Sequence, residues 1–173
     1  MTFDLQLLDR AAAEHLFSFE QENRNFFEKS VPGRGDDYYE WENFLRIHDS
    51  LLKEQAEGKS YFYLIRNDAG QLAGRINIVD IEDGTGHVGY RVGISHTGKG
   101  AAGSALALLK RKAGELGIRQ LRAKVLTNNP ASQKVLEKNQ FIREYMEKEA
   151  VWMNGEMAGF IHYSWQKDSD AVT

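Results

Sequence analysis

Hydrophobic and polar positions alternate along this chain with two different periods. A period of two, typical of a strand with one buried face, recurs near the N-terminus, through the middle and toward the C-terminus. A period of three to four, typical of an amphipathic helix, occupies the segments between. The predicted strands cover residues 3–8, 61–66, 72–81, 87–92, 121–126, 141–152 and 157–165, and the predicted helices cover residues 11–21, 38–57, 102–116 and 130–139.

Polar residues and glycines mark the ends of these helices. Asp9 and Asp36 have side-chain oxygens that can accept from the free amides at a helix start, so each is predicted to cap the helix that follows it. Gly58 is predicted to end the longest helix. Residues 25–37 contain a proline and two glycines and are predicted to form a loop between two helices.

Turn residues show how the strands connect. Segments 67–70 and 82–86 are turns between consecutive strands, which predicts an antiparallel meander. Asn154-Gly155 is a strong hairpin signal. The strand, helix and strand within residues 87–126 require a crossover and therefore a parallel pair. The fold class is thus α/β (α+β), with a central mixed, mostly antiparallel sheet flanked by helices.

Length and composition indicate an ordinary globular protein. The 173 residues, 42% hydrophobic and 27% charged, are predicted to form a single domain over residues 1–173 that frays at about residues 167–173. Neither a long apolar segment nor an N-terminal leader is visible, so a cytoplasmic protein that binds no membrane is expected. The absence of cysteine excludes a cysteine nucleophile, and the net charge of −3 argues against nucleic-acid binding. The five histidines are scattered, so no metal site is expected.

A glycine-rich turn lies between the strand at residues 87–92 and the helix that begins near residue 102. Glycines let a backbone approach a ligand closely, and the first amides of a helix are free to bind an anion such as a phosphate or pyrophosphate. A flexible surface loop explains this segment alone equally well. The turn matches neither the Walker A pattern nor the dinucleotide fingerprint.

Four motifs follow one another along the second half of the chain. They are Gly89-Tyr90-Arg91-Val92, Thr97-Gly98-Lys99-Gly100-Ala101-Ala102, Asn129-Pro130-Ala131-Ser132 and Leu136-Glu137-Lys138-Asn139-Gln140-Phe141. Together they resemble the GNAT superfamily of acetyl-CoA-dependent N-acetyltransferases, over about residues 60–165. Within it the closest resemblance is to the RimJ/RimL-type branch, which acetylates the N-termini of ribosomal proteins. The resemblance implies a GNAT-type acyl-CoA N-acyltransferase fold with acetyl-CoA as co-substrate and no metal.

The resemblance also implies where acetyl-CoA would bind. The thioester carbonyl oxygen would meet the N–H near Val92, and the pantetheine arm would pair with residues 92–94 like a strand. The pyrophosphate would bind the amides of residues 98–103, and Asn129 would hydrogen-bond the pantetheine or the loop. The predicted cofactor-binding residues are Val92, Gly93, Ile94, Thr97, Gly98, Lys99, Gly100, Ala101, Ala102, Gly103, Asn129 and Ser132.

Three residues are candidates for catalysis. Many GNAT enzymes have a tyrosine acid at the position of Leu136, whereas the Rim-type branch has the Asn-x-x-Ser pattern that Asn129 and Ser132 match. Ser132 is therefore the candidate that stabilises the leaving thiolate, and a serine that only caps its helix is the alternative. Tyr90 is a second candidate for this role, or simply a core tyrosine. His87 is the candidate base, because an imidazole titrates near neutral pH, or else a solvated turn residue.

The acceptor is predicted to be a primary amine, most simply the N-terminal α-amine of a protein or peptide. An α-amine has a pKa of about 7.7–8.0, so roughly a third is neutral near pH 7.5, compared with about one lysine in a thousand. Seven acidic residues from Glu20 to Glu42 would border the acceptor site in the resembled fold and attract a cationic amine, or simply form a solvated helix face.

Other functions are compatible with the same sequence. The acceptor could be a small amine, such as a polyamine or an antibiotic. The chain could be a non-catalytic acyl-CoA-binding module, since the usual tyrosine is absent, or a plain nucleotide-phosphate binder. It could act as a monomer, or as a homodimer that pairs through an exposed strand edge near Asn154-Gly155.

Overall fold

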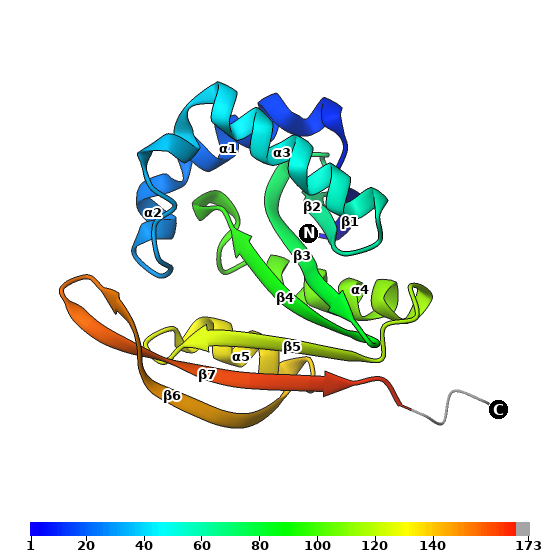
Figure 1. Cartoon of the computed structure of the whole chain (residues 1–173), viewed down its shortest axis with the longest axis vertical. Helices are drawn as coiled ribbons and strands as arrows, with labels where there is room; N and C mark the ends of the chain where they lie inside the picture. The colour runs from blue at the N-terminus through cyan, green and yellow to red at the C-terminus, as the bar shows by residue number, and fades with distance from the viewer. Residues whose placement is uncertain (169–173) are drawn as a thin grey trace.

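A seven-stranded sheet in the order β1-β2-β3-β4-β5-β7-β6 forms the centre of the protein, whose computed structural model describes residues 1–168 (Figure 1). Every neighbouring pair is antiparallel except β4 and β5, which are parallel, so the predicted mixed sheet is confirmed. The strands are β1 (Phe3–Leu7), β2 (Tyr61–Asn67), β3 (Leu72–Glu82), β4 (Thr85–Val92), β5 (Gln120–Leu126), β6 (Ile142–Met153) and β7 (Glu156–Gln166). The helices are α1 (Ala13–Glu22), α2 (Arg24–Glu28), α3 (Trp41–Ala56), α4 (Ala101–Glu115) and α5 (Pro130–Lys138), with short 3-10 turns η1 (Arg10–Ala12), η2 (Asp36–Tyr39) and η3 (Ile94–His96).

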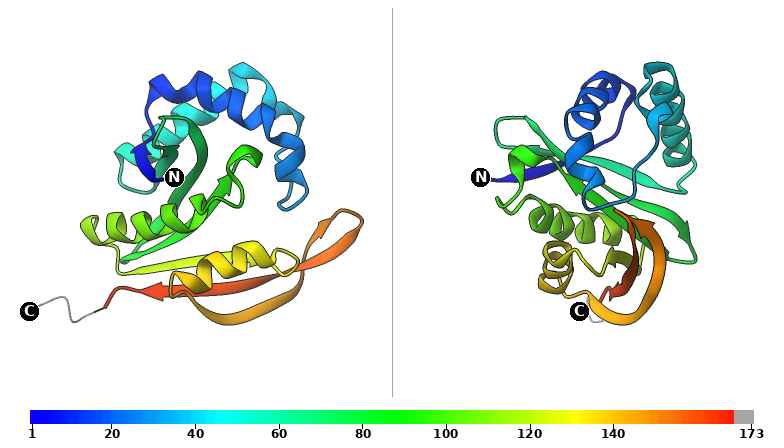
Figure 2. Two further views of the ribbon diagram at one scale, coloured as in Figure 1. Left: turned by 180° about the vertical axis from the view of Figure 1, so that it is seen from behind. Right: turned by 90° about the vertical axis from the view of Figure 1, so that its left-hand side faces the viewer.

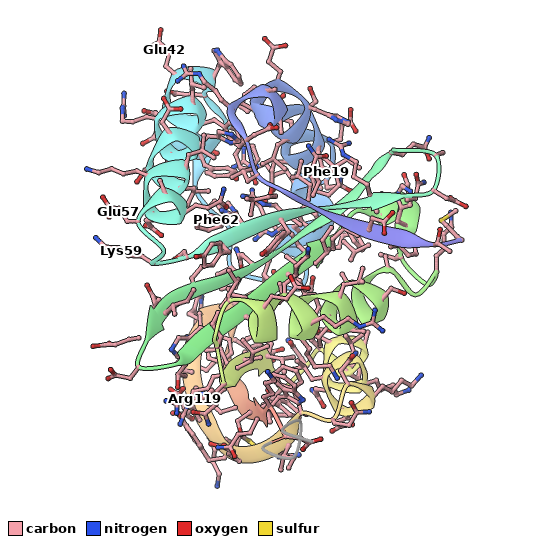
Figure 3. The ribbon with its side chains drawn as sticks, turned by 90° about the vertical axis from the view of Figure 1, so that its right-hand side faces the viewer. Phe19, Glu42, Glu57, Lys59, Phe62 and Arg119 are labelled. Atoms are coloured by element: carbon pink, nitrogen blue, oxygen red, sulfur yellow. The ribbon has the colours of Figure 1, made fainter. Side chains whose placement is uncertain are left out.

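The sheet separates two hydrophobic cores, one under each layer of helices. Along β2, Tyr63 and Ile65 face the core that α4 covers, whereas Phe62 and Leu64 face the core under α1 and α3. The right-hand view of Figure 2 shows the two helical layers on opposite sides of the sheet. In Figure 3, Phe19 and Phe62 lie between the N-terminal helices and the sheet. Alternation along a strand buried on both faces thus fixes both layers.

The N-terminal helices differ from the predicted ones at two places. The predicted loop at residues 25–37 is wrong in its first part, because α2 continues to Glu28 with Phe27 buried against the ring of Phe19. The predicted cap at Asp36 is also wrong, since α3 begins at Trp41 after the short turn η2. The Asp36 carboxylate instead accepts from the Arg24 guanidinium at 2.6 Å. An aromatic contact accompanies each difference: Phe27 packs on Phe19, and Trp41 at the start of α3 packs on Phe17.

Other predicted boundaries are confirmed. Asp9 caps the first helical turn by accepting from the Ala12 amide at 3.0 Å. Asn154 and Gly155 both have positive φ, as the predicted hairpin between β6 and β7 requires. The predicted fraying of the tail lies outside the described residues from residue 169 onward, and the Lys167 amide itself donates to the Arg119 carbonyl. No helix within residues 1–168 is long and apolar enough to cross a membrane.

Strands β4 and β5 pair over only three residues and then diverge. The pairs join residues 85–87 to residues 120–122, at the end of β4 that follows the β3–β4 turn. Beyond His87 the two strands separate, as Figure 1 shows on its left side. This fork places the second half of β4 opposite the second half of β5 with no strand between them.

Gly74 on β3 permits the close approach of β4 that supports the fork. A Cβ at this position would clash with the Arg91 carbonyl oxygen and lie 3.0 Å from the Val92 Cα, both backbone atoms. Gly74→Ala is therefore expected to lower the free energy of unfolding by about 1–3 kcal/mol. Gly114→Ala, in α4 with only ordinary contacts, is the matched control and is expected to gain about 0.5–1 kcal/mol. Urea unfolding of both variants checks the opposite signs, and an unchanged midpoint for Gly74→Ala would contradict the prediction.

Candidate active site

Two adjoining cavities open at the fork. The fork cavity, of about 270 Å³, is lined by residues 88–91 of β4 and residues 123–126 of β5. The loop cavity, of about 360 Å³, lies beside it against the glycine-rich turn and the start of α4. Tyr90, Arg91, Asn129 and Ser132 line both. These shared residues therefore stand where two ligands could meet.

The loop cavity has the features of an anion site. Gly98 and Gly100 have φ of 73° and 80°, a conformation that lets the backbone turn directly into α4. Gly100 precedes the helix and supplies no side chain, so no side chain caps the first amides. In an α-helix these amides have no intrahelical acceptor, and they can therefore donate to a phosphate.

Most of the predicted cofactor-binding residues gather at this cavity. Gly93 and Lys99 line a separate hollow beside α1, and Ile94 is exposed and outside the lining. The cofactor-binding residues that do line the loop cavity are Val92, Thr97, Gly98, Gly100, Ala101, Ala102, Gly103, Asn129 and Ser132.

The backbone at the end of β4 presents one amide to the fork. The Gly93 amide donates to the Ala73 carbonyl of β3, and N–H groups alternate sides along a strand. The Val92 amide therefore points away from β3, toward the fork. The Ile94 amide donates to Asn23 Oδ1 at 2.8 Å and is already paired.

Ser132 and Tyr90, which the sequence suggested as rivals, are hydrogen-bonded to each other. Their hydroxyl oxygens are 2.7 Å apart, and the Tyr90 hydroxyl also lies 3.3 Å from the Ser132 carbonyl. Burial raises the pKa of Tyr90 to about 12, although the bond to Ser132 opposes the shift. The phenol therefore stays protonated throughout the physiological range. Asn129 accepts from the Ser132 amide at 3.2 Å and so fixes the first turn of α5.

His87 lies apart from this pair. It pairs with Val79 of β3 and Arg122 of β5, at the closed end of the fork, and its side chain is exposed. It is absent from the lining of both cavities. The structure thus brings together two of the three predicted catalytic residues and leaves the third outside.

Glu20, Arg75 and Arg91 form a buried charge cluster under the fork that the sequence patterns do not predict. Glu20 of α1 is completely buried and accepts from Arg75 at 2.9 Å and from Arg91 at 3.2 Å. The Arg75 guanidinium also donates to the Tyr38 hydroxyl. The expectation that Glu20 belongs to an exposed acidic rim is therefore wrong, because two arginines hold it inside. The charges of the three residues gave no local signal, since they are 55 and 71 positions apart.

Burial acts differently on the two guanidiniums. Burial alone lowers the pKa of Arg75, but Tyr38 and Glu20 more than offset it and raise that pKa. Burial, together with nearby Arg34, lowers the pKa of Arg91. Both side chains remain charged at any pH at which the protein is folded, because a guanidinium does not deprotonate in proteins.

Within residues 1–168 no group of three or more His, Asp or Glu is placed to hold a metal ion.

Comparison with known proteins identifies the class of enzyme to which this fork and loop belong. Residues 4–142 match the family model described as an acetyltransferase (GNAT) domain. The chain is 30% identical, over 159 residues, to the probable N-acetyltransferase YjcK of Bacillus subtilis (strain 168), and the match covers 89% of this chain and 88% of that protein. The chain therefore belongs to the GNAT acetyltransferase family and is an N-acetyltransferase.

Solved structures share the whole fold. The ribosomal-protein-S5-alanine acetyltransferase of Vibrio fischeri superimposes with a TM-score of 0.90 at 19% identity, over 98% of this chain and 95% of that one. RimL, a ribosomal L7/L12 α-N-protein acetyltransferase in complex with coenzyme A, gives a TM-score of 0.88 at 24% identity, over 98% and 97%. The predicted GNAT fold is thus confirmed, and these two ribosomal-protein acetyltransferases share it. Proteins with this fold bind the predicted co-substrate or its product: RimL is in complex with coenzyme A, and the microcin C7 self-immunity acetyltransferase MccE is in complex with acetyl-CoA.

Proposed function

We propose that this enzyme transfers the acetyl group of acetyl-CoA to the N-terminal α-amine of a protein or peptide. The observation that carries the proposal is the junction of the two cavities. One cavity offers helix amides to an anion, and the other, between the diverging strands, leads to the same Tyr90 and Ser132. The similarity to enzymes that acetylate ribosomal-protein N-termini supports the same acceptor class.

Acetyl-CoA is assigned to the loop cavity. The amides at the start of α4 receive the pyrophosphate, and the positive φ of Gly98 and Gly100 keeps the backbone clear of it. The pantetheine arm runs from there toward the junction. The Val92 amide points to the fork and can donate to the thioester carbonyl oxygen, where negative charge develops during attack.

The transfer itself is a direct attack. The neutral amine nitrogen forms a bond to the acetyl carbon, and the carbon–sulfur bond breaks as the tetrahedral intermediate collapses. Ser132 donates its hydroxyl proton to the departing thiolate and regains one from the Tyr90 hydroxyl, 2.7 Å away. The proton lost by the attacking amine passes through water and restores the proton that Tyr90 gave up, so both hydroxyls end the reaction protonated. A covalent acyl-cysteine is excluded, because the sequence contains no cysteine.

The lining of the fork cavity favours an α-amine over a lysine. No Asp, Glu or His lines this cavity within the described residues, so no side chain there can act as a strong base. An acceptor that is already partly neutral at pH 7.5 does not need one, and an α-amine, with a pKa of about 7.7–8.0, satisfies this condition. A lysine, with a pKa of about 10.4, does not.

Release of coenzyme A measured with a thiol reagent tests the proposal. The protein contributes no thiol background, because it has no cysteine. Peptides with free N-termini are expected to drive release, and the same peptides with acetylated N-termini are expected to drive none. Polyamines, aminoglycosides and lysine peptides with blocked N-termini complete the panel. Release with these compounds alone would contradict the proposal, as would acetyl-CoA binding without release on any acceptor.

A further inference from the structure

The fork cavity is strongly cationic. Its lining contains four basic side chains from four segments: Arg34 of the loop before η2, Arg75 of β3, Arg91 of β4 and Lys124 of β5. Among the described residues that line it, none is acidic. Glu20 lies behind Arg75 and Arg91, completely buried, and within residues 1–168 it is the one carboxylate that forms a salt bridge with any of these four side chains. A single negative charge therefore faces four positive ones.

The buried arginines keep donors for a ligand. The bonds of Arg75 to Glu20 and Tyr38 both use its Nη1 atom, and the bond of Arg91 to Glu20 also uses Nη1. A guanidinium has five N–H donors in a planar fork, so most donors of each side chain stay free. Arg34 and Lys124 are exposed at the rim, where they stack on Tyr38 and Phe160.

This charge distribution selects among amine acceptors. A polyamine brings two or more positive charges and would be repelled by the lining. A carboxylate would form charge-assisted hydrogen bonds with arginines that are already fixed in place. The cations also disfavour the ammonium form of a nearby amine and so lower its pKa, which increases the neutral fraction that can attack. The same residues thus bind an anionic group and activate an amine beside it.

We propose that the acceptor carries a carboxylate close to its reactive amine, and specifically that it is a peptide N-terminus with Asp or Glu at the second or third position. This inference rests on the proposed N-terminal acetylation and deepens it. Ser132 and Arg75 line the same small cavity, so amine and carboxylate must both fit within it. Each extended residue spans about 3.3–3.6 Å, so the second and third positions lie within about 7 Å of the first along the peptide.

Competition between matched peptides tests the inference. The peptides share one sequence, an amidated C-terminus and a free N-terminus, and differ only in having Asp, Asn or Lys at position two or three. At low salt, kcat/KM for the Asp peptide is expected to exceed that of the Asn peptide about tenfold, with the Lys peptide slower still. The preference is expected to narrow at about 1 M salt, where the Debye length falls to about 3 Å.

Variants at the rim connect the preference to this cavity. Arg34→Gln and Lys124→Gln are each expected to reduce the Asp-to-Asn ratio about threefold, because each removes one exposed cation from the lining. Arg111→Gln is the matched control: it removes an equal charge from an exposed position on α4 outside both cavities, and the ratio is expected to stay unchanged. Binding of acetyl-CoA, measured separately, verifies that each variant is folded.

The outcomes separate the inference from the proposed function. Equal kcat/KM for the Asp, Asn and Lys peptides would overturn the inference while leaving N-terminal acetylation standing. A preference for Lys, or a ratio that the Arg34 and Lys124 variants leave unaltered, would also overturn it. Acetylation of polyamines with no activity on any free N-terminus would overturn the proposed function, and the inference with it.

Discussion

Glu20→Gln is expected to lower the free energy of unfolding by about 3–5 kcal/mol. This is the largest effect on stability among the substitutions that we predict for this chain. Glu20 is completely buried and pairs with Arg75 at 2.9 Å and Arg91 at 3.2 Å. Glutamine keeps the size and one acceptor oxygen but removes the negative charge. Two guanidiniums with side-chain exposures of 10% and 16% are then left without a counterion. Breaking a buried pair in this way leaves a desolvated charge uncompensated.

Thermal and urea unfolding measure this effect. For a protein of this length the expected fall in melting temperature is about 10 °C. Glu14→Gln is the matched control, because Glu14 lies on the same helix but is exposed, and its substitution is expected to cost less than about 1 kcal/mol. If Glu20→Gln melted within two or three degrees of the wild type, the arginines would have found other partners and the argument would fail.

Ser132→Ala is expected to lower kcat about 100-fold, the loss typical of removing a general acid. The hydroxyl lies at the junction of both cavities, where the departing thiolate would be protonated. The KM for acetyl-CoA is expected to change little, because the amides at the start of α4 remain in place. Ser50→Ala, an exposed serine on α3, is the control and is expected to leave kcat unaltered.

The Tyr90–Ser132 pair gives this prediction a second readout. Tyr90→Phe removes the 2.7 Å hydrogen bond and the proton supply to Ser132, so a fall of about tenfold in kcat is expected. The double variant is expected to be about as slow as Ser132→Ala alone, since the two hydroxyls act as one unit. Additive losses, or a Ser132→Ala enzyme within twofold of the wild type, would show that another group protonates the thiolate.

The sequence by itself determined the strands, their connections and most of the helices, with α2 and the start of α3 as the exceptions. Alternation along β2 and the helical spacing in α4 are local signals, since neighbouring residues alone decide which face each side chain takes. The turn at Asn154-Gly155 is equally local, because its positive φ angles suit these two residues. The order of strand, helix and strand then required the parallel pairing of β4 with β5. The motifs at residues 97–102 and 129–132 are also local signals, and most of their residues line the loop cavity.

Only the tertiary structure decided which candidate residues meet. Ser132 and Tyr90 are separate candidates in the sequence, and the fold joins them across 42 positions. His87 shares a strand with Tyr90, yet pairing with β5 places it at the closed end of the fork. No side chain caps the start of α3, where Trp41 packs on Phe17 of α1.

The positive charge of the fork cavity is the feature that the sequence predicts least well. Counted along the chain, the N-terminal helices are acidic and suggest a site for cations. In the folded protein Glu20 turns inward to Arg75 and Arg91, and the cavity lining collects basic residues from β3, β4, β5 and a loop. Linear charge patterns cannot predict this result, because the electric field at a point depends on which distant residues the fold brings within a few ångströms of it.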